Sequence, residues 1–293
     1  MKPIRVLSLF DGISCGQVAL ERAGIPVEVY YASEIDKYAI QVTMKNYPNT
    51  IQLGDVEKIN FIQLRGKIDL LICGSPCQDL SIMGKQAGLN GEKSKLFYKY
   101  IEALAIIKPK YFLLENNVGM PKNAYEEISR IIGCYPIEIN SALLSAQNRR
   151  RFYWTNIGDK NYNLFGFPTV AISQPKNKHI SMQDILTSGY ATRYKTGALV
   201  VCGGDGLNRP AKKNLKQMWH RHNKHFLTLV LEEKDNKNSA RYLNRIERER
   251  LQTLPENYTD ILEEKRAAGG IGNGWTVDVI AHIFSYLKEE LGK

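Results

Sequence analysis

A cysteine that follows a predicted strand is the residue of this chain best suited to covalent chemistry. Cys77 lies in the segment Gly74-Ser75-Pro76-Cys77-Gln78, directly after the apolar run of residues 69–73. A thiolate is a strong nucleophile, and a loop beyond a strand end can expose the thiol and lower its pKa. An isolated cysteine is more often a small buried hydrophobic residue. Cys77 is therefore a candidate nucleophile whose role depends on the groups that accompany it.

An acidic residue follows another predicted strand and could supply a proton. Glu115 and then Asn116 come directly after the apolar run of residues 111–114. A partly desolvated carboxyl group at such a place can act as a general acid. The alternative is an acidic residue that only accepts hydrogen bonds from backbone N–H groups at a helix N-terminus.

A basic cluster precedes an aromatic strand. The segment Gln147-Asn148-Arg149-Arg150-Arg151 leads into Phe152-Tyr153-Trp154. Because alternate residues of a strand face the same way, we expect Gln147, Arg149 and Arg151 to line one face. That face could point into the crevice at the strand ends.

A glycine-containing turn and an acidic residue suggest a nucleoside site. The turn, Asp11-Gly12-Ile13-Ser14-Cys15-Gly16, follows a predicted strand over residues 4–10. It lacks both the G-x-G-x-x-G spacing of a dinucleotide site and the Lys-Ser/Thr pair of a phosphate loop, so it suits a nucleoside without pyrophosphate. Glu34 follows the next strand and is placed to accept hydrogen bonds from ribose hydroxyls. Ordinary turn glycines and a surface acid are the alternative.

The segments that must position these groups alternate between strand and helix patterns. Predicted strands cover residues 4–10, 27–32, 51–53, 69–73 and 111–114, and predicted helices cover residues 17–23, 37–46, 96–107 and 125–132. This alternation predicts an α/β fold whose parallel sheet is covered on both faces. Since ligands bind at the carboxyl ends of such strands, we expect the strand-end residues to converge on one crevice.

The pattern changes after residue 157. Periodicity is poor through residue 238 and returns with a helix over 243–251. Residues 276–291 follow, as an amphipathic helix or as a strand that leads into a helix. We predict that residues 1–157 and 239–293 form the main body, and that residues 158–238 form a second, smaller domain.

Composition excludes several classes of protein. The chain has 293 residues, of which 43% are apolar and 24% charged, so a disordered or fibrous protein is excluded. We find no apolar run long enough for a membrane span and no secretory signal pattern, and we expect a cytoplasmic protein without membrane contact. Its 5 cysteines are odd in number and sparse, which favours a reducing compartment over a disulfide scaffold.

The net charge of +10 is concentrated in one segment. Residues 158–238 carry 13 basic and 6 acidic side chains, whereas residues 1–70 carry 8 of each. A concentrated basic segment is typical of a polyanion partner, with a solvated lysine-rich loop as the alternative. His220, His222 and His225 lie in this segment without a neighbouring carboxylate or thiol, so we expect no metal site.

Taken together, these motifs resemble the DNA (cytosine-5) methyltransferases over nearly the whole chain. The matching blocks, in the family's order, are F-D-G-I-S-C-G (10–16), Glu34, G-D-V (54–56), G-S-P-C-Q-D-L-S (74–81), L-E-N (114–116), Q-N-R-R-R (147–151), R-Y-L-N-R-I-E-R-E-R-L-Q-T-L-P (241–255) and G-N-G-W-T-V (272–277). The first, fourth and last blocks are most similar to the animal de novo subgroup, in a short chain of bacterial or phage type. Two departures are the Ser14-Cys15 pair and Asn117, which stands where the family usually has valine.

The resemblance implies a Rossmann-like S-adenosylmethionine-dependent methyltransferase domain with a target recognition domain at residues 158–238. It implies transfer of a methyl group to carbon 5 of a flipped-out cytosine in duplex DNA, through a covalent intermediate on Cys77. The catalytic residues that it implies are Cys77, Glu115, Arg149 and Arg151. The cofactor contacts that it implies are Phe10, Asp11, Ile13, Gly16, Glu34, Asp55, Val56, Gly74, Pro76, Asn273 and Trp275. The expected substrate contacts are Ser75, Gln78, Asn116, Gln147, Lys212 and Lys213.

Two alternatives remain open. The same chemistry could act on tRNA, as in one branch of the family, although the basic segment leans toward DNA. The second alternative is a catalytically inactive regulator that binds DNA. The presence of Cys77, Glu115 and Arg151 together argues against it. A cognate restriction endonuclease is a candidate partner, and no obligate protein partner is evident. The recognised DNA sequence cannot be read from these motifs.

Overall fold

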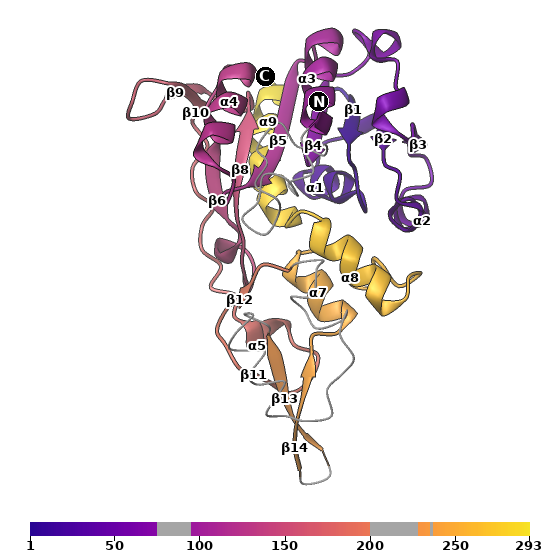
Figure 1. Cartoon of the computed structure of the whole chain (residues 1–293), viewed down its shortest axis with the longest axis vertical. Coiled ribbons are helices and arrows are strands. Elements are labelled where there is room, and N and C mark those ends of the chain that lie inside the picture. Colours follow the sequence, from indigo (N-terminus) through magenta and orange to yellow (C-terminus); the bar gives the residue numbers. More distant parts are fainter. Residues whose placement is uncertain (75–94, 200–227, 235–236) are drawn as a thin grey trace. The chain divides into compact units, whose positions relative to one another are not determined.

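The computed structural model of the chain describes residues 1–74, 95–199, 228–234 and 237–293 (Figure 1). The chain forms two compact units, each assembled from several segments. The first unit comprises Met1–Ile139, Arg150–Gln174 and Ile280–Lys293, and the second comprises Asn140–Arg149 and Pro175–Val279. This division describes compactness and not function, so the assignment of residues 158–238 to target recognition stays a prediction.

A seven-stranded sheet forms the centre of the first unit. Its strands, in spatial order, are β3 (Ile51–Gln52), β2 (Val27–Ser33), β1 (Ile4–Leu9), β4 (Leu70–Gly74), β5 (Tyr111–Asn117), β8 (Arg150–Thr155) and β6 (Ile137–Asn140). Strands β1 to β5 pair in parallel, which confirms the predicted α/β sheet. Strand β8 runs antiparallel to β5, a reversal that the apolar pattern of the sequence did not indicate.

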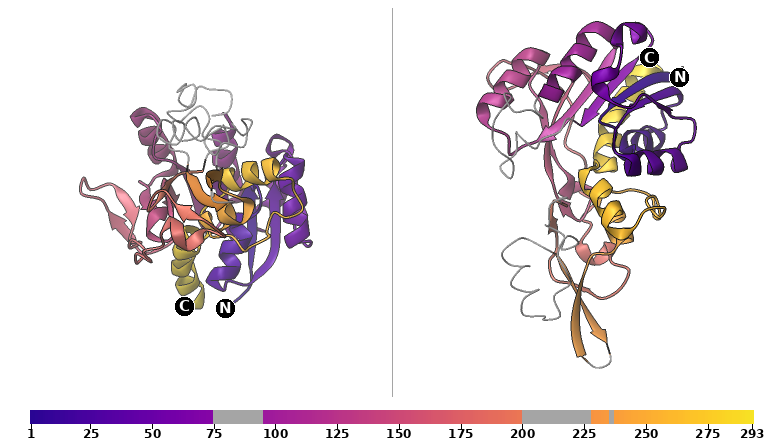
Figure 2. Two further views of the ribbon diagram at one scale, coloured as in Figure 1. Left: turned by 90° about the horizontal axis from the view of Figure 1, so that it is seen from below. Right: turned by 45° about the vertical axis from the view of Figure 1, so that its right-hand side comes forward.

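Helices cover both faces of this sheet (Figures 1 and 2). One hydrophobic core joins β1, β4, β5 and β8 to α3 (Lys95–Ile107) and α4 (Lys122–Ile132). Alternate residues of β1 and β4 point to the opposite face, which α1 (Cys15–Ala23) and α9 (Val277–Gly292) cover. Figure 2 shows α4 and α9 on opposite sides of the sheet.

Local chemistry explains how well the helices were predicted. Helix α2 has the predicted bounds, Lys37–Asn46, because the Asp36 carboxylate accepts a hydrogen bond from the Tyr38 N–H group and caps its first turn. The last predicted helix corresponds to α9. By contrast, α8 (Glu264–Asn273) was not predicted, since it contains a Gly-Gly pair and its N-cap residue makes no side-chain hydrogen bond.

The structure corrects the prediction that Glu115 lies just beyond its strand. Strand β5 continues to Asn117, so Glu115 and Asn116 are residues of the strand itself. The extension has a partner, because Asn117 pairs with Arg151 and Glu115 pairs with Tyr153 of β8.

The second unit contains two small sheets and three helices among its described residues. Strand β7 (Gln147–Asn148) pairs with β12 (Thr196–Gly197), and β11 (Tyr190–Ala191) joins the hairpin of β13 (Leu229–Lys234) and β14 (Lys237–Tyr242). The helices are α5 (Met182–Ile185), α7 (Arg245–Leu251) and α8. The segment expected to be irregular also contributes a hairpin to the first unit, formed by β9 (Lys160–Tyr162) and β10 (Pro168–Val170).

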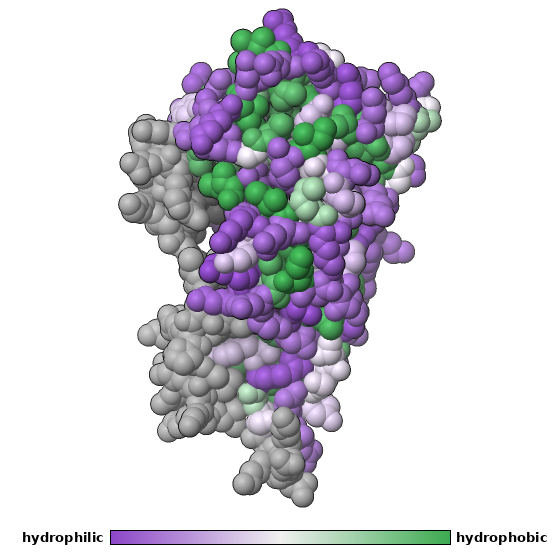
Figure 3. All heavy atoms as spheres, turned by 90° about the vertical axis from the view of Figure 1, so that its right-hand side faces the viewer, coloured by the Kyte–Doolittle hydropathy of each residue, from purple (hydrophilic) through white to green (hydrophobic). Residues whose placement is uncertain are grey.

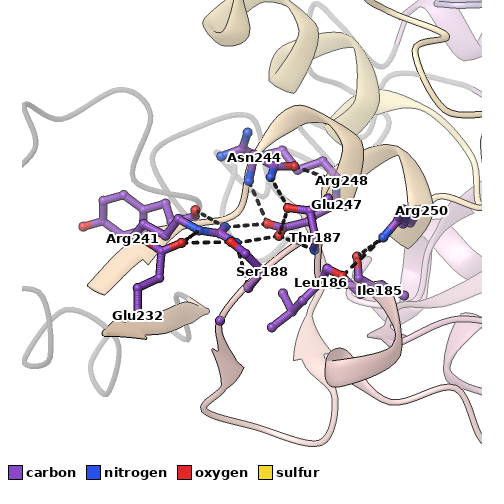
Figure 4. A network of polar contacts seen from close by, with 12 residues as sticks. Ile185, Leu186, Thr187, Ser188, Glu232, Arg241, Asn244, Glu247, Arg248 and Arg250 are labelled. Atoms are coloured by element: carbon purple, nitrogen blue, oxygen red, sulfur yellow. Dashed lines mark hydrogen bonds and ion pairs between the residues drawn. The ribbon is translucent and has the colours of Figure 1, made fainter. Parts of the chain in front are cut away.

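A buried ion pair ties the β13–β14 hairpin to α7 (Figure 4). The Arg241 guanidinium donates to both Glu247 carboxylate oxygens at 2.8 Å and to Glu232 at 2.7 Å. Glu247 is fully buried and also accepts hydrogen bonds from the Thr187 N–H and hydroxyl groups. Burial acts to raise the pKa of Glu247, but the hydrogen bonds from Arg241 and Thr187 outweigh it and hold that pKa below its usual range. The carboxylate therefore depends on Arg241 for its buried charge.

The surface is mixed in character. Figure 3 shows hydrophobic residues in several small groups separated by hydrophilic ones on the face that it displays. Across the described ranges, no helix combines the length and apolar character needed to cross a bilayer.

Candidate active site

An ion pair stands at the carboxyl end of β5 in the first unit. The Arg151 Nε atom lies 2.8 Å from the Glu115 Oε1 atom, and both side chains are largely buried. Strand pairing fixes this pair, because Glu115 lies opposite Gly74 of β4 and Arg151 lies opposite Asn117. A carboxylate and a guanidinium held together in this way can present both a hydrogen-bond acceptor and a donor to a planar polar ring.

The turn after this pair is set by the asparagine that departs from the family pattern. The Asn117 side-chain oxygen accepts a hydrogen bond from the Gly119 N–H group at 2.9 Å. Asn116 is buried, and its side-chain oxygen accepts a hydrogen bond from the Asn117 N–H group at 2.7 Å. Asn117 therefore closes the turn that follows the strand.

The thiols of two described cysteines are poor nucleophiles at neutral pH. Burial, and then the charge of Glu115, raises the pKa of Cys73 well above its usual value. Burial raises the pKa of Cys134 to about 11. The predicted nucleophile, Cys77, lies outside the described residues, as do Ser75, Pro76, Gln78, Lys212 and Lys213.

The turn after β1 holds a second carboxylate in a network of hydroxyl groups. The Tyr30 hydroxyl donates to the Asp11 Oδ1 atom at 2.8 Å, and the Ser14 hydroxyl donates to the Oδ2 atom. Thr43 and Gln17 in turn donate to the Ser14 oxygen, at 3.1 and 3.2 Å. Burial raises the pKa of Asp11 to about 6. The charge of Glu34 also raises this pKa, whereas the hydrogen bonds from the hydroxyl groups lower it.

Glu34 ties the first two strand-end turns together. Its Oε2 atom accepts a hydrogen bond from the Gly12 N–H group at 2.8 Å. Its Oε1 atom accepts from the N–H groups of Ile35 at 2.7 Å and Asp36 at 2.8 Å. The turn after β1 has left-handed backbone angles at three residues, since φ is 56° at Phe10, 58° at Gly12 and 58° at Ser14.

The other predicted cofactor residues of the first unit lie close to this turn or to the next strand end. Ile13 and Gly16 are buried at the start of α1. Asp55 is half-buried, and its carboxylate accepts a hydrogen bond from the Glu57 N–H group at 3.0 Å, while Val56 is buried. The Ser33 hydroxyl at the end of β2 donates to the Gly54 carbonyl at 2.8 Å, so β2 and the turn after β3 are joined.

The first unit offers groups that fit S-adenosylmethionine. A carboxylate has about four acceptor sites. Within the part of the chain that the structure describes, three N–H groups donate to Glu34, which leaves one site for a sugar hydroxyl. Asp11, a half-buried residue, offers its carboxylate to a cationic group, and a Cβ atom added at Gly12 would meet no atom of the described residues within 4 Å. Among the described residues, no three His, Cys, Asp or Glu side chains are grouped in a way that could hold a metal ion.

The predicted strand face of Gln147, Arg149 and Arg151 is divided between two strands. The expected single strand is interrupted at Arg149, which lies between β7 and β8. Gln147 and Arg149 are buried in the second unit, whereas Arg151 belongs to the first. The second unit also contains Asn273, which is exposed, and Trp275, which is half-buried.

Three residues of these networks were missed from the sequence. Tyr30 and Ser14 hold Asp11, and Gln252 is the centre of a buried polar network in the second unit. Ser14 was visible as a departure from the family pattern, and Gln252 lies in the matching block at residues 241–255. A hydroxyl on a buried strand, as at Tyr30, gives no such signal.

Comparison with protein families and with individual proteins identifies the fold and the family. Residues 4–203 match the model of the C-5 cytosine-specific DNA methylases. The orphan methyltransferase M.SPRI of Bacillus phage SPR is 36% identical over 166 residues, which make up 52% of this chain and 37% of the phage protein. The type II methyltransferase M1.ScrFI of Lactococcus lactis subsp. cremoris is 27% identical over 99% of this chain and 79% of its own length.

A solved structure extends the likeness to the whole fold. The methyltransferase EhMeth of Entamoeba histolytica superposes over 100% of both chains with a TM-score of 0.70, at 18% sequence identity. The chain spans about a third of the length of the two Bacillus phage relatives that it matches, 37% and 33%. The family match covers more than half of the chain, and the chain therefore belongs to the C-5 cytosine-specific DNA methylase family.

Proposed function

We propose that this protein transfers a methyl group from S-adenosylmethionine to carbon 5 of a flipped-out cytosine in duplex DNA. The observation that carries the proposal is the Glu115–Arg151 pair, held at 2.8 Å opposite Gly74. The proposed nucleophile, Cys77, follows Gly74 by three positions in the sequence. Family membership supports the same reaction.

The chain's own residues supply the steps that make cytosine reactive. The Cys77 thiolate adds to carbon 6 of the ring, and the electron pair released toward carbon 5 makes that carbon a nucleophile. Glu115 delivers a proton to ring nitrogen 3 as the thiolate adds, accepts a hydrogen bond from the exocyclic amine, and takes the proton back when Cys77 leaves. Arg151 donates to the ring carbonyl, so both residues stabilise the charge that develops on the ring. After methyl transfer a base removes the carbon 5 proton, and its electron pair re-forms the double bond as Cys77 leaves.

The cofactor supplies an electrophilic methyl group on a sulfonium. Phe10, Asp11, Ile13 and Gly16 line the first turn of the proposed cofactor site, and Glu34 accepts a hydrogen bond from the ribose. Further proposed cofactor contacts are Asp55, Val56, Gly74, Pro76, Asn273 and Trp275.

The substrate assignment to DNA rests on charge as well as on the family. Residues 158–238, the proposed target recognition domain, carry most of the net positive charge, and counterion release favours a polyanion there. Lys212 and Lys213 are proposed phosphate contacts, and a duplex target requires base flipping. Ser75, Gln78, Asn116 and Gln147 are the other proposed substrate contacts.

The test uses tritium-labelled cofactor with duplex DNA and with tRNA. We expect label in DNA and none in tRNA, whereas label only in tRNA would assign the protein to the tRNA branch. Replacement of Cys77 by serine should abolish transfer and also abolish the covalent adduct with 5-fluorocytosine DNA. Equal activity of the wild type and Cys77→Ser would refute the mechanism.

The relatives suggest a biological setting. Several are named type II methyltransferases, which supports a role in restriction and modification, with a cognate endonuclease as candidate partner. We place the protein in the cytoplasm of a prokaryotic or phage-infected cell, bound to DNA. Bisulfite sequencing of plasmid from expressing cells would report the modified base and its sequence context together.

A further inference from the structure

The carbonyl groups at the end of α8 are bound by two buried side chains of the second unit. The Gln252 amide nitrogen donates to the carbonyls of Ile271 at 2.9 Å and Gly274 at 3.0 Å. The Arg149 guanidinium donates to the carbonyls of Gly272 at 3.3 Å and Gly274 at 3.1 Å. The Ile271 carbonyl also accepts a hydrogen bond from the Gly274 N–H group at 3.2 Å. The last carbonyls of a helix otherwise lack partners within the helix, so these side chains complete the hydrogen bonding at its end.

These contacts are built into the interior of the unit. Arg149 is 6% exposed and Gln252 is fully buried. A buried guanidinium is costly unless its donors are satisfied, and Arg149 donates also to the Leu199 carbonyl at 3.2 Å. The negative end of the α8 dipole favours a cation at this place. Arg149 is thus bound to backbone that is more than a hundred residues further along the chain.

Further residues fix the amide of Gln252 in its orientation. Its side-chain oxygen accepts hydrogen bonds from the Thr276 hydroxyl at 2.8 Å and from the Gln147 amide at 3.1 Å. With the oxygen occupied by donors, the nitrogen of Gln252 must face the α8 carbonyls. Gln252 therefore binds the segment before Gly274, at Ile271, and after it, at Thr276.

The segment held in this way carries two side chains that are not fully buried. Asn273 is exposed and Trp275 is half-buried, while Gly274 between them is buried. The buried residue is the one whose carbonyl both Arg149 and Gln252 bind. Fixing the backbone at Gly274 sets the direction of the side chains on either side of it.

We infer that Arg149 and Gln252 are positioning residues for the Asn273–Trp275 segment, and that Arg149 acts on cofactor binding instead of on cytosine. This inference rests on the proposed function, in which Asn273 and Trp275 contact the cofactor. It gives Arg149 a role different from the catalytic one that the resemblance implies. Of the three arginines in the Q-N-R-R-R block, Arg151 pairs with Glu115, Arg150 pairs with Glu138, and Arg149 binds the carbonyls at the end of α8.

The experiment separates cofactor affinity from the chemical step. In Arg149→Gln and in Gln252→Met, calorimetry without DNA should show an S-adenosylhomocysteine Kd raised about tenfold, which corresponds to loss of one or two buried hydrogen bonds. The KM for S-adenosylmethionine should rise with it, while kcat at saturating cofactor falls by less than about threefold. Arg149→Lys, which keeps the charge but loses the planar fork, should give an intermediate Kd.

The matched control is Arg150→Gln, which removes an exposed arginine of the same block that pairs with Glu138. It should bind S-adenosylhomocysteine like the wild type. A wild-type Kd together with a large loss of kcat in Arg149→Gln or Arg149→Lys would overturn the inference and return Arg149 to the cytosine. A wild-type protein that fails to bind S-adenosylhomocysteine would instead refute the proposed function.

Discussion

Removal of one hydroxyl group, in Tyr30→Phe, should shift the pH at which the protein loses affinity for its cofactor. Tyr30 is buried, with 3% of its surface exposed, and its hydroxyl donates to the Asp11 carboxylate at 2.8 Å. Phenylalanine keeps the ring and removes only the donor. The substitution therefore tests one hydrogen bond to one carboxylate.

The size of the shift follows from the hydrogen bond that is lost. Burial raises the pKa of Asp11 to about 6, although the hydroxyl of Tyr30 lowers it. A hydrogen bond to a charged group contributes about 1.5 kcal/mol or more, which is about one pH unit in a titration midpoint. We expect the midpoint to move from about pH 6 in the wild type to about pH 7 in the variant.

The sign of the effect is set by the charge of the ligand. S-adenosylmethionine is cationic, so the ionised form of Asp11 should bind it and the protonated form should not. At pH 6 about half of the wild type and about a tenth of the variant would be ionised, which makes the variant about fivefold weaker. At pH 7 the difference should shrink to about twofold.

Calorimetric Kd values between pH 5 and pH 7.5 would measure this shift. Asp11→Asn is the matched control, because it keeps the shape of the side chain and removes its titration, so its affinity should lack the step. A midpoint that stays near pH 6 in Tyr30→Phe would refute the role of the hydroxyl. A step that persists in Asp11→Asn would show that another group titrates.

Three further variants test other parts of the molecule. Arg151→Lys keeps the charge but loses the planar fork, and we expect kcat to fall about a hundredfold with little change in cofactor Kd; an unchanged kcat would contradict its role. Arg241→Met leaves the buried Glu247 carboxylate without its partner and should cost about 3 kcal/mol of unfolding free energy in urea at pH 7. The cost should be smaller at pH 4, because in the variant burial raises the pKa of Glu247 without the opposing hydrogen bonds from Arg241, and the group can stay neutral. Glutamate at both Lys212 and Lys213 should weaken DNA binding and flatten its salt dependence while leaving cofactor affinity unchanged. Weaker cofactor binding would contradict the assignment of these two lysines to DNA phosphates.

The elements that sequence patterns predicted well are those whose signals are local. Helix α2 has an N-cap aspartate at its start and a Tyr-Pro pair just after it, and its bounds were correct. Strand β4 is a continuous apolar run because both of its faces are buried. The same kind of reasoning located Glu115, Asp11 and Glu34 near strand ends.

The features that were missed depend on partners far away in the sequence. Strand β5 continues past Glu115 only because an antiparallel strand pairs with it, and no pattern within β5 reports that partner. Arg149 is buried because it binds carbonyls at Gly272 and Gly274. In an isolated stretch of sequence, an arginine beside two others indicates an exposed basic face.

The way the chain is shared between the two units limits how the second unit can be exchanged for that of a relative. The chain passes from one unit to the other between residues 139 and 140, 149 and 150, 174 and 175, and 279 and 280. An exchange of Pro175–Val279 alone would leave behind Asn140–Arg149, which supplies β7 as the partner of β12 and both Gln147 and Arg149. A chimera that takes residues 175–279 from a donor should therefore take residues 140–149 from the same donor, so that β7, Gln147 and Arg149 match the strand β12 and the end of α8 that they contact.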